Sequence, residues 1–321
     1  MDSETVRIEL GLKSYTVDAT FYFFNHGDST QVAVGFPEVG HASGVIDAVY
    51  ELLKEQRLRS FETWVDGVKT EVRDLPGEVR LGGKKTDYDS AEELVKKKLE
   101  PEGADYASVE ERRWLVKEVA FKSGRYTVVR VRYASQTGVD GNGSHAGYIY
   151  GTGRSWKGPI GSMRFIIQAS SQAWVHELEF PEERKYKVAR LSEYECSYLL
   201  EGIKPKEDEA LALRFGDSFQ PWDIRKAYND WEYVDHPVPD ELLHALSRRQ
   251  LKLLRNTFFA GHGRIFKDPE LQSFFDASSV SRYGWYTARA DFKDADLNEN
   301  ERRNVQKIMR YEKDLTESLG R

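Results

Sequence analysis

The sequence predicts an α+β protein of two domains, an antiparallel β-sandwich with helical insertions in residues 1–220 and a small all-α domain in residues 240–321. Apolar and polar residues alternate through much of the first part, which is typical of half-buried strands. In the last part apolar residues recur every three or four positions, as on one face of a helix. Residues 221–239 have prolines at both ends and no sustained period, which indicates a connecting segment.

Length and composition agree with two soluble globular domains. At 321 residues the chain is long enough for about two domains that each bury a core. Hydrophobic residues make up 40% and charged residues 31%, and the net charge is −6. Because general nucleic-acid binders gain affinity from cationic contacts to phosphate, we expect no nucleic-acid partner.

The cysteine count and the apolar runs restrict the class of protein further. Cys196 is the single cysteine, which excludes an intrachain disulfide and a thiolate metal cluster. No apolar run approaches the roughly 20 residues that cross a bilayer, so we expect no membrane span. The opening MDSETVRIEL lacks the apolar core of a signal peptide. A cytoplasmic protein and a mature exported protein whose leader has been removed both fit.

The N-terminal stretch predicts strands joined by tight turns. Three runs alternate with a period of two, at Val6, Ile8 and Leu10, then Val17, Ala19, Phe21 and Phe23, then Val32, Val34 and Phe36. Residues 25–28 supply the turn before the third strand, which runs to Phe36-Pro37. Over residues 46–58 the apolar spacing shifts towards a helix. Strand alternation returns over residues 61–65, before an Asp66-Gly67 turn.

The middle of the chain predicts a polar excursion followed by helix and strand. Residues 74–103 are polar and charged, which indicates a surface segment with one short amphipathic helix. Ser108 with Glu111 forms a capping box, so we expect a second helix over residues 108–119. Residues 129–133 then alternate valine or tyrosine with arginine, as in a strand with one solvated face. Further strands are expected near residues 165–169, 175–180, 193–200 and 211–215.

Residues 148–161, YIYGTGRSWKGPIG, predict a glycine- and proline-rich loop between two strands. A phosphate cradle is excluded because no Gly-Lys-Ser/Thr follows the glycines and no helix opens there. Ser155 is not in a nucleophile elbow, since Lys157 takes the place of the last glycine. We interpret Trp156 as the plug of the strand core. The alternative is that an exposed Trp156, with Tyr148, Tyr150 and Arg154, stacks on a sugar or a peptide.

Two acidic stretches resemble metal sites without completing one. Residues 140–143, DGNG, lack the later carboxylates of a calcium loop. Asp291, Asp294, Asp296 and Asn298 cluster before the last predicted helix, but Glu299, sixth from Asp294, stands where an EF-hand loop needs glycine. None of the seven histidines is at metal-ligand spacing from another. We therefore expect no metal, no cofactor and no catalytic residue.

The last part of the chain predicts three helices with clear end signals. Leu251, Leu254 and Phe258 form the apolar stripe of a helix over about residues 239–260, which ends at the glycines of residues 261–263. Asp268 with Pro269 indicates the start of a second helix over residues 268–276. Asn298 and Glu301 indicate the cap of a third, over residues 298–317.

Residues 254–275, LRNTFFAGHGRIFKDPELQSFF, resemble the core of the YARHG domain, a small bacterial domain usually found in exported proteins. The matching residues are Leu254, Arg255 and Asn256, then Phe259, Ala260, Gly261, His262 and Gly263, then Phe266, Lys267, Asp268, Pro269, Glu270 and Leu271. Phe259 stands where the family has tyrosine, and Gly261 where it has arginine. The resemblance implies a YARHG-like domain over about residues 240–318, and no established biochemical activity comes with the family.

Residues 5–218 are similar to the strand-rich N-terminal domain of certain uncharacterised bacterial exported proteins. The similarity rests on the residues that close a long hairpin, Thr152-Gly153, Trp156 and Gly158-Pro159-Ile160. It rests also on the Asn25 turn, Phe36-Pro37 and the Val65-Asp66-Gly67 turn in the first half. Both resemblances imply an extracellular or periplasmic protein after removal of a leader. From the residues alone, a cytoplasmic protein stays open.

The YARHG-like loop contributes four candidate binding residues, Arg255, Asn256, Phe259 and His262. A histidine between two glycines can act as a proton carrier or contact a ligand. The structural interpretation, which we favour, is that its ring satisfies a carbonyl at the helix end. For Arg255 and Asn256 we likewise favour a buried network over a binding pair.

Together these observations favour a noncatalytic exported protein whose β domain and helical module bind a cell-envelope component or a protein partner. One alternative is an envelope-associated hydrolase that uses His262 or an acidic residue of a cleft. Another is a small-molecule sensor, which needs a sizeable apolar cavity between the sheets. The oligomeric state does not follow from the sequence.

Overall fold

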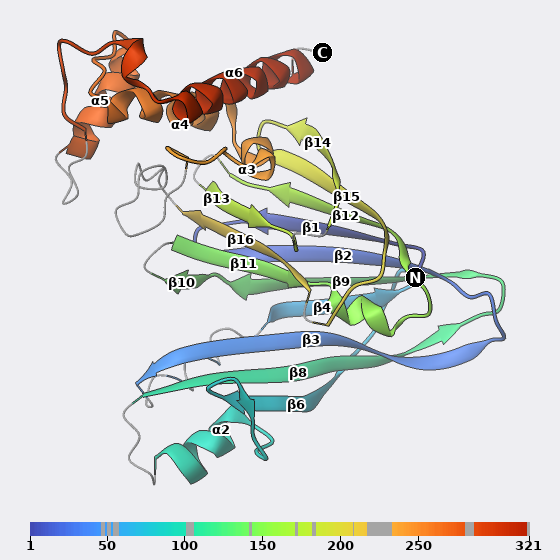
Figure 1. Ribbon diagram of the computed structural model, residues 1–321. Helices are drawn as coiled ribbons and strands as arrows, with labels where there is room; N and C mark the ends of the chain where they lie inside the picture. Colours follow the sequence, from blue (N-terminus) through green and yellow to red (C-terminus); the bar gives the residue numbers. More distant parts are fainter. Residues whose placement is uncertain are drawn as a thin grey trace. The chain divides into compact units, whose positions relative to one another are not determined.

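The computed structural model describes residues 1–45, 49, 53, 58–100, 106–140, 143–170, 173–181, 184–207, 209–216, 233–279 and 286–319. The first part of the chain is rich in strands and the last part is helical, as predicted (Figure 1). The chain divides into two compact units. The first comprises Met1–Ile166, Phe180–Lys187 and Tyr198–Ala212, and the second Ile167–Glu179, Val188–Ser197 and Leu213–Arg321.

The strands form three sheets. Their bounds are β1 (Ser3–Leu10), β2 (Ser14–Phe24), β3 (Thr30–Val45), β4 (Arg59–Val65), β5 (Val68–Lys69), β6 (Arg73–Leu81), β7 (Lys84–Lys85), β8 (Tyr106–Phe121), β9 (Tyr126–Gln136), β10 (Gly138–Asp140), β11 (Gly143–Ile149), β12 (Ile160–Gln168), β13 (Trp174–Glu179), β14 (Lys187–Ser192), β15 (Glu195–Ile203) and β16 (Ala210–Gly216). The strand orders are β14-β15-β12-β1-β2-β9-β4-β5, β10-β11-β16-β13 and β3-β8-β6-β7.

Strands β1, β2 and β9 confirm the alternation seen in the sequence. They pair antiparallel, with Ile8 opposite Val17 and Ala19 opposite Val131. Ile8, Val17 and Ala19 are fully buried, while the residues between them are more exposed. This sheet meets the β3–β8 sheet through aromatic side chains, because the ring of Phe23 in β2 lies 5.5 Å from the ring of Phe121 in β8.

Strand β3 is longer than predicted and continues through Pro37 to Val45. Pro37 lies opposite Trp114 of β8. A proline cannot donate to a ladder, so it is tolerated here because β3 is the edge strand of its sheet.

The helix predicted over residues 108–119 is wrong, since these residues belong to the 16-residue strand β8. Alternate residues are buried at each end of β8, Ala107 and Val109 at one end and Val119 and Phe121 at the other, and β8 pairs with β3 along its whole length. This long-range pairing outweighs the local capping signal of Ser108 and Glu111. The Glu111 carboxylate instead accepts the backbone N–H of Ala91 at 3.1 Å, at the start of a different helix.

Residues 74–100 of the predicted polar excursion are more ordered than the sequence suggested, and residues 101–103 lie outside the described residues. Strand β6 pairs with β8, and helix α2 (Ala91–Leu94) continues as a π-helical turn through Val95–Leu99. Leu94 and Leu99 pack with Val79 and Val109 in a small core. Val49 and Leu53 belong to that core too, and most of the helix predicted over residues 46–58 lies outside the described residues.

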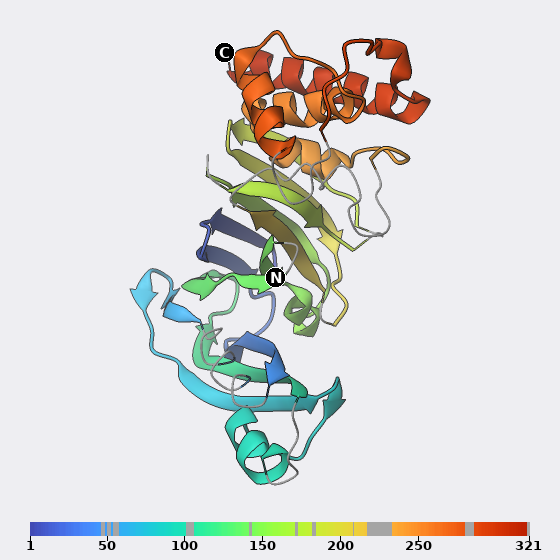
Figure 2. The ribbon, with the colours of Figure 1, turned by 90° about the vertical axis from the view of Figure 1, so that its left-hand side faces the viewer.

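The C-terminal part folds into helices α3 (Asp240–Ala245), α4 (Arg248–Gly261), α5 (Pro269–Ser279) and α6 (Glu299–Leu319). The helix predicted over residues 239–260 is therefore two helices, because Ser247 and Gln250 form a capping box that starts α4. Leu251, Leu254 and Phe258 pack with Ile308 and Leu315 of α6 in one core. Figure 2 shows α4 and α6 side by side.

The predicted caps of the last two helices are confirmed. The Asp268 side chain accepts the N–H of Glu270 at 3.0 Å, and Pro269 is the first residue of α5. Asn298 and Glu301 accept each other's backbone N–H at 2.8 Å. Residues 217–232, and so most of the predicted connecting segment 221–239, lie outside the described residues. None of the helices within the described ranges is long and apolar enough to cross a membrane.

Candidate functional site

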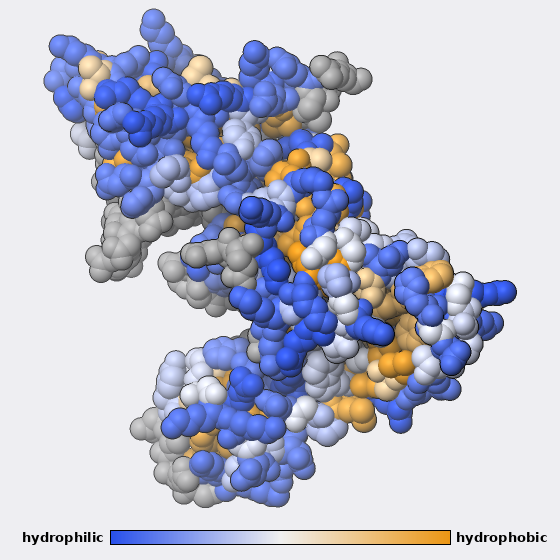
Figure 3. All heavy atoms as spheres, turned by 45° about the vertical axis from the view of Figure 1, so that its right-hand side comes forward, coloured by the Kyte–Doolittle hydropathy of each residue, from blue (hydrophilic) through white to orange (hydrophobic). Residues whose placement is uncertain are grey.

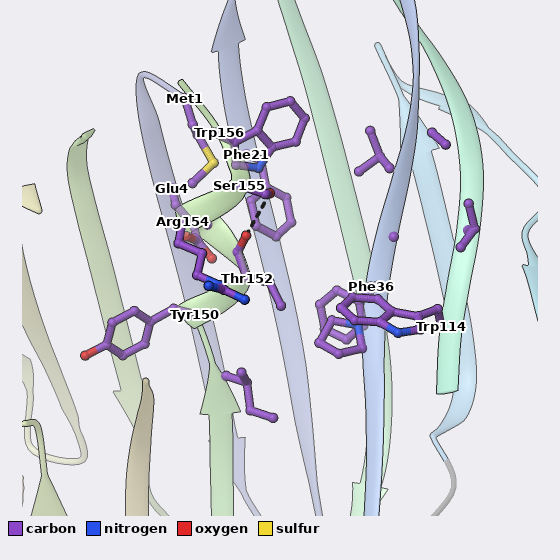
Figure 4. Close-up of a pocket in the computed structure, with 18 of the residues that line it drawn as sticks. Met1, Glu4, Phe21, Phe36, Trp114, Tyr150, Thr152, Arg154, Ser155 and Trp156 are labelled. Atoms are coloured by element: carbon purple, nitrogen blue, oxygen red, sulfur yellow. Dashed lines mark hydrogen bonds between the residues drawn. The ribbon is translucent and has the colours of Figure 1, made fainter. Parts of the chain in front are cut away.

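The first compact unit contains a pocket of about 730 Å³ along β3, which is the edge strand of its sheet among the described residues. One wall is the backbone and side chains of residues 32–37, and the opposite wall is the 3-10 helix Gly151–Ser155 with Trp156. Figure 4 shows Trp156, Thr152 and Arg154 on one side and Phe36 with Trp114 on the other. The lining is mainly aromatic and aliphatic, as is usual for ligand pockets.

Backbone hydrogen bonds hold the 3-10 helix against the sheet. The N–H groups of Tyr150 and Gly151 donate to the carbonyl of Glu209 at 2.9 and 2.8 Å. The Lys204 ammonium donates to the carbonyl of Trp156 at 2.8 Å. The position of Trp156 is therefore fixed from both sides of the turn.

Trp156 stands between two adjoining pockets. Its ring centre lies 4.3 Å from that of Phe23 and 5.9 Å from that of Phe121, and its side chain is half-buried. Beyond it lies a second pocket of about 560 Å³, lined by Thr30, Val32 and the 157–159 turn among others. Both pockets are lined by Val32, Phe23 and Trp156. We call this pair of pockets along Thr30–Pro37 the β3 groove.

The wall formed by β3 carries two large rings. Phe36 lies 5.3 Å from Tyr133 and 5.6 Å from Phe61, measured between ring centres, so it is anchored in the first unit's aromatic core. Trp114 lies over Gly35, where a Cβ atom would come within 3.1 Å of its ring. Gly35 thus lets the indole lie flat against the strand. Figure 3 shows apolar side chains gathered in patches on the strand-rich part, among mostly hydrophilic ones.

The charged residues of the groove differ sharply in exposure. Arg154 and Glu207 form an exposed ion pair at 2.7 Å, and Lys157 is exposed beside them. Glu4, in contrast, is 3% exposed and accepts a 2.6 Å hydrogen bond from the Tyr148 hydroxyl. Burial raises the pKa of Glu4 from 4.5 to about 7, and the hydrogen bond from Tyr148 opposes that rise.

Three of the residues singled out from the sequence come together in this groove. Tyr148, Arg154 and Trp156 all line the larger pocket. Tyr148 is buried in β11, and neighbouring Tyr150 is buried as well, so the accessible surface is supplied by Trp156 and Arg154. Trp156 packs on Phe23, as the plug interpretation requires, and its half-buried ring also lines the groove.

The other four candidate residues lie in the second compact unit, around the C-terminal end of α4. Arg255 forms an ion pair with Glu312 at 2.8 Å. Asn256 is buried and donates to the carbonyl of Lys252 at 2.7 Å. Phe259 lies under the guanidinium of Arg264, whose central carbon is 4.7 Å from the ring centre. These contacts are internal to the helical part.

His262 makes a different contact from the one expected. Its Nε2 lies 2.8 Å from Oε2 of Glu301, a residue with a 2% exposed side chain at the start of α6. The sequence suggested a helix-end carbonyl as the partner. The ring thus connects the C-terminal end of α4 to the N-terminal end of α6.

Sequence reasoning missed Glu4, Phe36 and Trp114 as groove residues. Glu4 lies on the same face of β1 as the buried Val6, Ile8 and Leu10, so the two-residue alternation of the sequence could have identified it as a buried carboxyl. Phe36 and Trp114 carry no such signal, because the pairing of β3 with β8 brings them together from distant parts of the chain. Within the described residues, no group of three or more His, Cys, Asp or Glu side chains could hold a metal ion.

Comparison with known proteins identifies the helical part. Residues 226–313 match the YARHG domain. No curated protein sequence gives a significant match. Among solved structures, a Legionella pneumophila protein described provisionally as nutrient binding aligns at 18% identity over 97% of this chain and 93% of its own, with a TM-score of 0.44.

Two M1 zinc metallopeptidases also align, each at 8% identity over 66% of this chain and 41% of their own length. The first is a two-domain enzyme with bound L-arginine, at a TM-score of 0.29. The second is from Deinococcus radiodurans, at a TM-score of 0.27. At such TM-scores the superpositions are too loose to assign a function.

Proposed function

We propose that this protein, whose residues 226–313 match the YARHG domain, is a noncatalytic exported protein of bacteria that binds a component of the cell envelope. We further propose that the β3 groove holds the ligand. Alternatively, the component that it binds is a protein partner in the envelope. The groove is concave, largely apolar and furnished with a few charged groups at its rim, the combination typical of ligand sites.

The observation that carries the proposal is the position of Trp156. Its indole is half-buried on Phe23 and stands between pockets of about 730 and 560 Å³. A tryptophan held in this way offers a rigid apolar surface with a polar N–H, at little cost in conformational entropy. Carbohydrates and peptides both bind well to such surfaces.

The chemistry of the groove favours binding over catalysis. General acid-base or nucleophilic catalysis needs at least two groups oriented towards one another. Of the acidic side chains that line the larger pocket, Glu207 is paired with Arg154 at the surface and Glu4 is bonded to Tyr148 in the interior. This arrangement favours electrostatic and apolar contacts with a ligand.

Export is proposed from the YARHG domain, which is usual in exported proteins. In this proposal His262, Arg255 and Asn256 have a structural role. Their polar groups contact Glu301, Glu312 and the carbonyl of Lys252, respectively. The division of the chain at residues 221–239 is also retained as a proposal.

Co-sedimentation of the full chain with purified cell-wall sacculi tests the proposal. Trp156→Ala removes the central ring, and Trp64→Ala is its matched control, because Trp64 is half-buried outside both pockets with Arg130 over its ring. Each folded variant is compared with the wild type. We expect binding by the wild type and Trp64→Ala and at least roughly tenfold weaker binding by Trp156→Ala. Equal binding by the two variants would count against the groove.

An envelope-associated hydrolase is the second candidate, and one observation favours it. Glu4 is an acidic residue of the groove whose pKa is raised to about 7 by burial, a value suited to a general acid near neutral pH. If Glu4 is catalytic, the wild type releases soluble sugars or peptides from sacculi and Glu4→Gln does not. Binding without release by either protein would exclude this function.

A further inference from the structure

We infer that the ligand of the β3 groove is an extended peptide segment that pairs with β3 as an additional strand. The inference rests on the proposed function, since it names the chemical class of ligand for the same site. It follows from three features of the groove: an open strand edge, side-chain pockets along that edge, and a cationic rim.

The first feature is the open edge of β3. The strand pairs with β8 along all 16 residues on one side. On its other side, no strand pairs with it in the part of the chain that the structure describes. An open edge presents unpaired N–H and C=O groups, which are a template for another strand.

Pro37 indicates which backbone groups face outwards. Since proline has no N–H to give to a ladder, its backbone is expected to point away from β8. Backbone direction alternates along a strand, so Ala33 and Gly35 also point their N–H and C=O groups to the open edge. Ala33 and Gly35 are both exposed. Their amides can therefore pair with an incoming strand without loss of the β3–β8 ladder.

The second feature is that the pockets follow this edge. Residues 32–37 all line the larger pocket, while Thr30 and Val32 line the smaller one. Alternate side chains of an extended peptide are about 7 Å apart, so a strand along Thr30–Pro37 passes both pockets. In strand addition, the backbone hydrogen bonds supply affinity and such side-chain pockets supply selectivity.

The third feature is the charge of the rim. Arg154 and Lys157 are exposed on the wall opposite β3. Glu207 neutralises Arg154 through their ion pair and Glu4 is buried, so the exposed positive charge that remains on this wall is that of Lys157. The preferred peptide therefore alternates apolar residues, for the aromatic walls, with acidic residues, for the rim.

A synthetic peptide in which valine and glutamate alternate provides the probe. A length of about eight residues matches Thr30–Pro37 at the rise of one strand residue per ~3.3 Å. Two further versions carry N-methyl groups, one on every valine and the other on every glutamate. Strand addition uses the N–H groups of only one of these two sets. We expect one methylated version to bind roughly tenfold or more weakly and the other to bind like the parent peptide.

A pair of variants at Ala33 tests the same hydrogen bonds from the protein side. Ala33→Pro removes the outward N–H, and Ala33→Val retains it with a side chain that suits a strand. Circular dichroism checks that each variant is folded. We expect roughly tenfold or greater loss of peptide affinity for Ala33→Pro and little change for Ala33→Val. If Ala33→Pro does not fold, the affinities of the two methylated peptides for the wild type still test whether the peptide pairs with β3.

Three results overturn the inference: absence of binding by the parent peptide, equal binding of both methylated versions, or unchanged affinity in folded Ala33→Pro. If these results accompany sacculus binding that depends on Trp156, the proposed function stands and the ligand is of another class, such as a glycan. If the peptide binds by strand addition while sacculus binding is absent or independent of Trp156, the ligand class stands and the envelope assignment fails.

Discussion

Nε2 of His262 lies 2.8 Å from Oε2 of Glu301, which is 39 residues later in the chain. The same glutamate accepts the backbone N–H of Asn298 at 2.8 Å and so caps α6. One carboxylate thus joins the end of α4 to the beginning of α6. The histidine of the YARHG-like stretch therefore contacts the residue that caps the next long helix.

The first prediction is that His262→Ala lowers the free energy of unfolding by about 1–2 kcal/mol, because a buried carboxylate loses a hydrogen-bond partner. His236→Ala is the control, since His236 is exposed in the same unit and we expect a change within about 0.5 kcal/mol. Urea unfolding of the full chain measures both. Equal effects of the two substitutions would show that the Glu301 contact contributes nothing.

The second prediction concerns Gly263, which follows that histidine. Its φ is +86°, and a Cβ atom there would lie 2.6 Å from the carbonyl oxygen of Thr287. Gly263→Ala should therefore cost about 2–4 kcal/mol of stability. Gly124→Ala is the control. Gly124 also has a positive φ, +64°, but no atom lies near the place that a Cβ atom would take. Thermal or urea unfolding should give about 1–2 kcal/mol for that control.

The third prediction is a pH dependence caused by Glu4. Burial raises the pKa of Glu4 from 4.5 to about 7. Between these pH values the Glu4 carboxyl is therefore ionised in the unfolded chain and protonated in the folded chain. Stability therefore falls as pH rises through this window, by about 3 kcal/mol in total. Glu4→Gln retains an acceptor for Tyr148 and lacks the titration. Urea unfolding from about pH 4 to about pH 8 should show that the free energy of unfolding of the variant rises relative to that of the wild type by this amount. The same pH dependence in both proteins would contradict the prediction.

The fourth prediction concerns Lys117, which is 5% exposed and donates to the hydroxyl of Thr63. Burial lowers the pKa of Lys117 from 10.5 to about 8. The buried charge of Lys117 therefore destabilises the folded state fully below pH 8. This destabilisation decreases as the pH rises towards 10.5, because the folded protein loses the proton before the unfolded chain does. Lys117→Met should stabilise the protein at neutral pH by about 1–2 kcal/mol. Exposed Lys122→Met is the control, and a gain for both or neither would contradict the prediction.

Much of the fold follows from local patterns that the structure confirms. Alternation identified β1, β2 and β9, and the end signals at Asp268 and Asn298 identified the starts of α5 and α6. The strand β8 shows where local reasoning fails. Ser108 and Glu111 satisfy a capping rule, but pairing with β3 on one side and β6 on the other determines the conformation.

The candidate site could be predicted only in part. Trp156 and Arg154 are recognisable in an unusual loop, and the buried Glu4 could be found from its phase with Val6 and Ile8. The groove itself could not be found, because its β3 wall and its 3-10 wall are separated by more than a hundred residues in the sequence. No local pattern encodes which strand edge is left open.

Hydrogen exchange of the full chain, with and without soluble cell-wall fragments, tests the central claim most directly. If the β3 groove holds the ligand, the amides of residues 31–37 and 151–156 become protected when the fragments bind. The amides around residues 254–263 should exchange as before. Protection confined to the 254–263 loop, or binding with no change along β3, would contradict the assignment of the groove as the binding site.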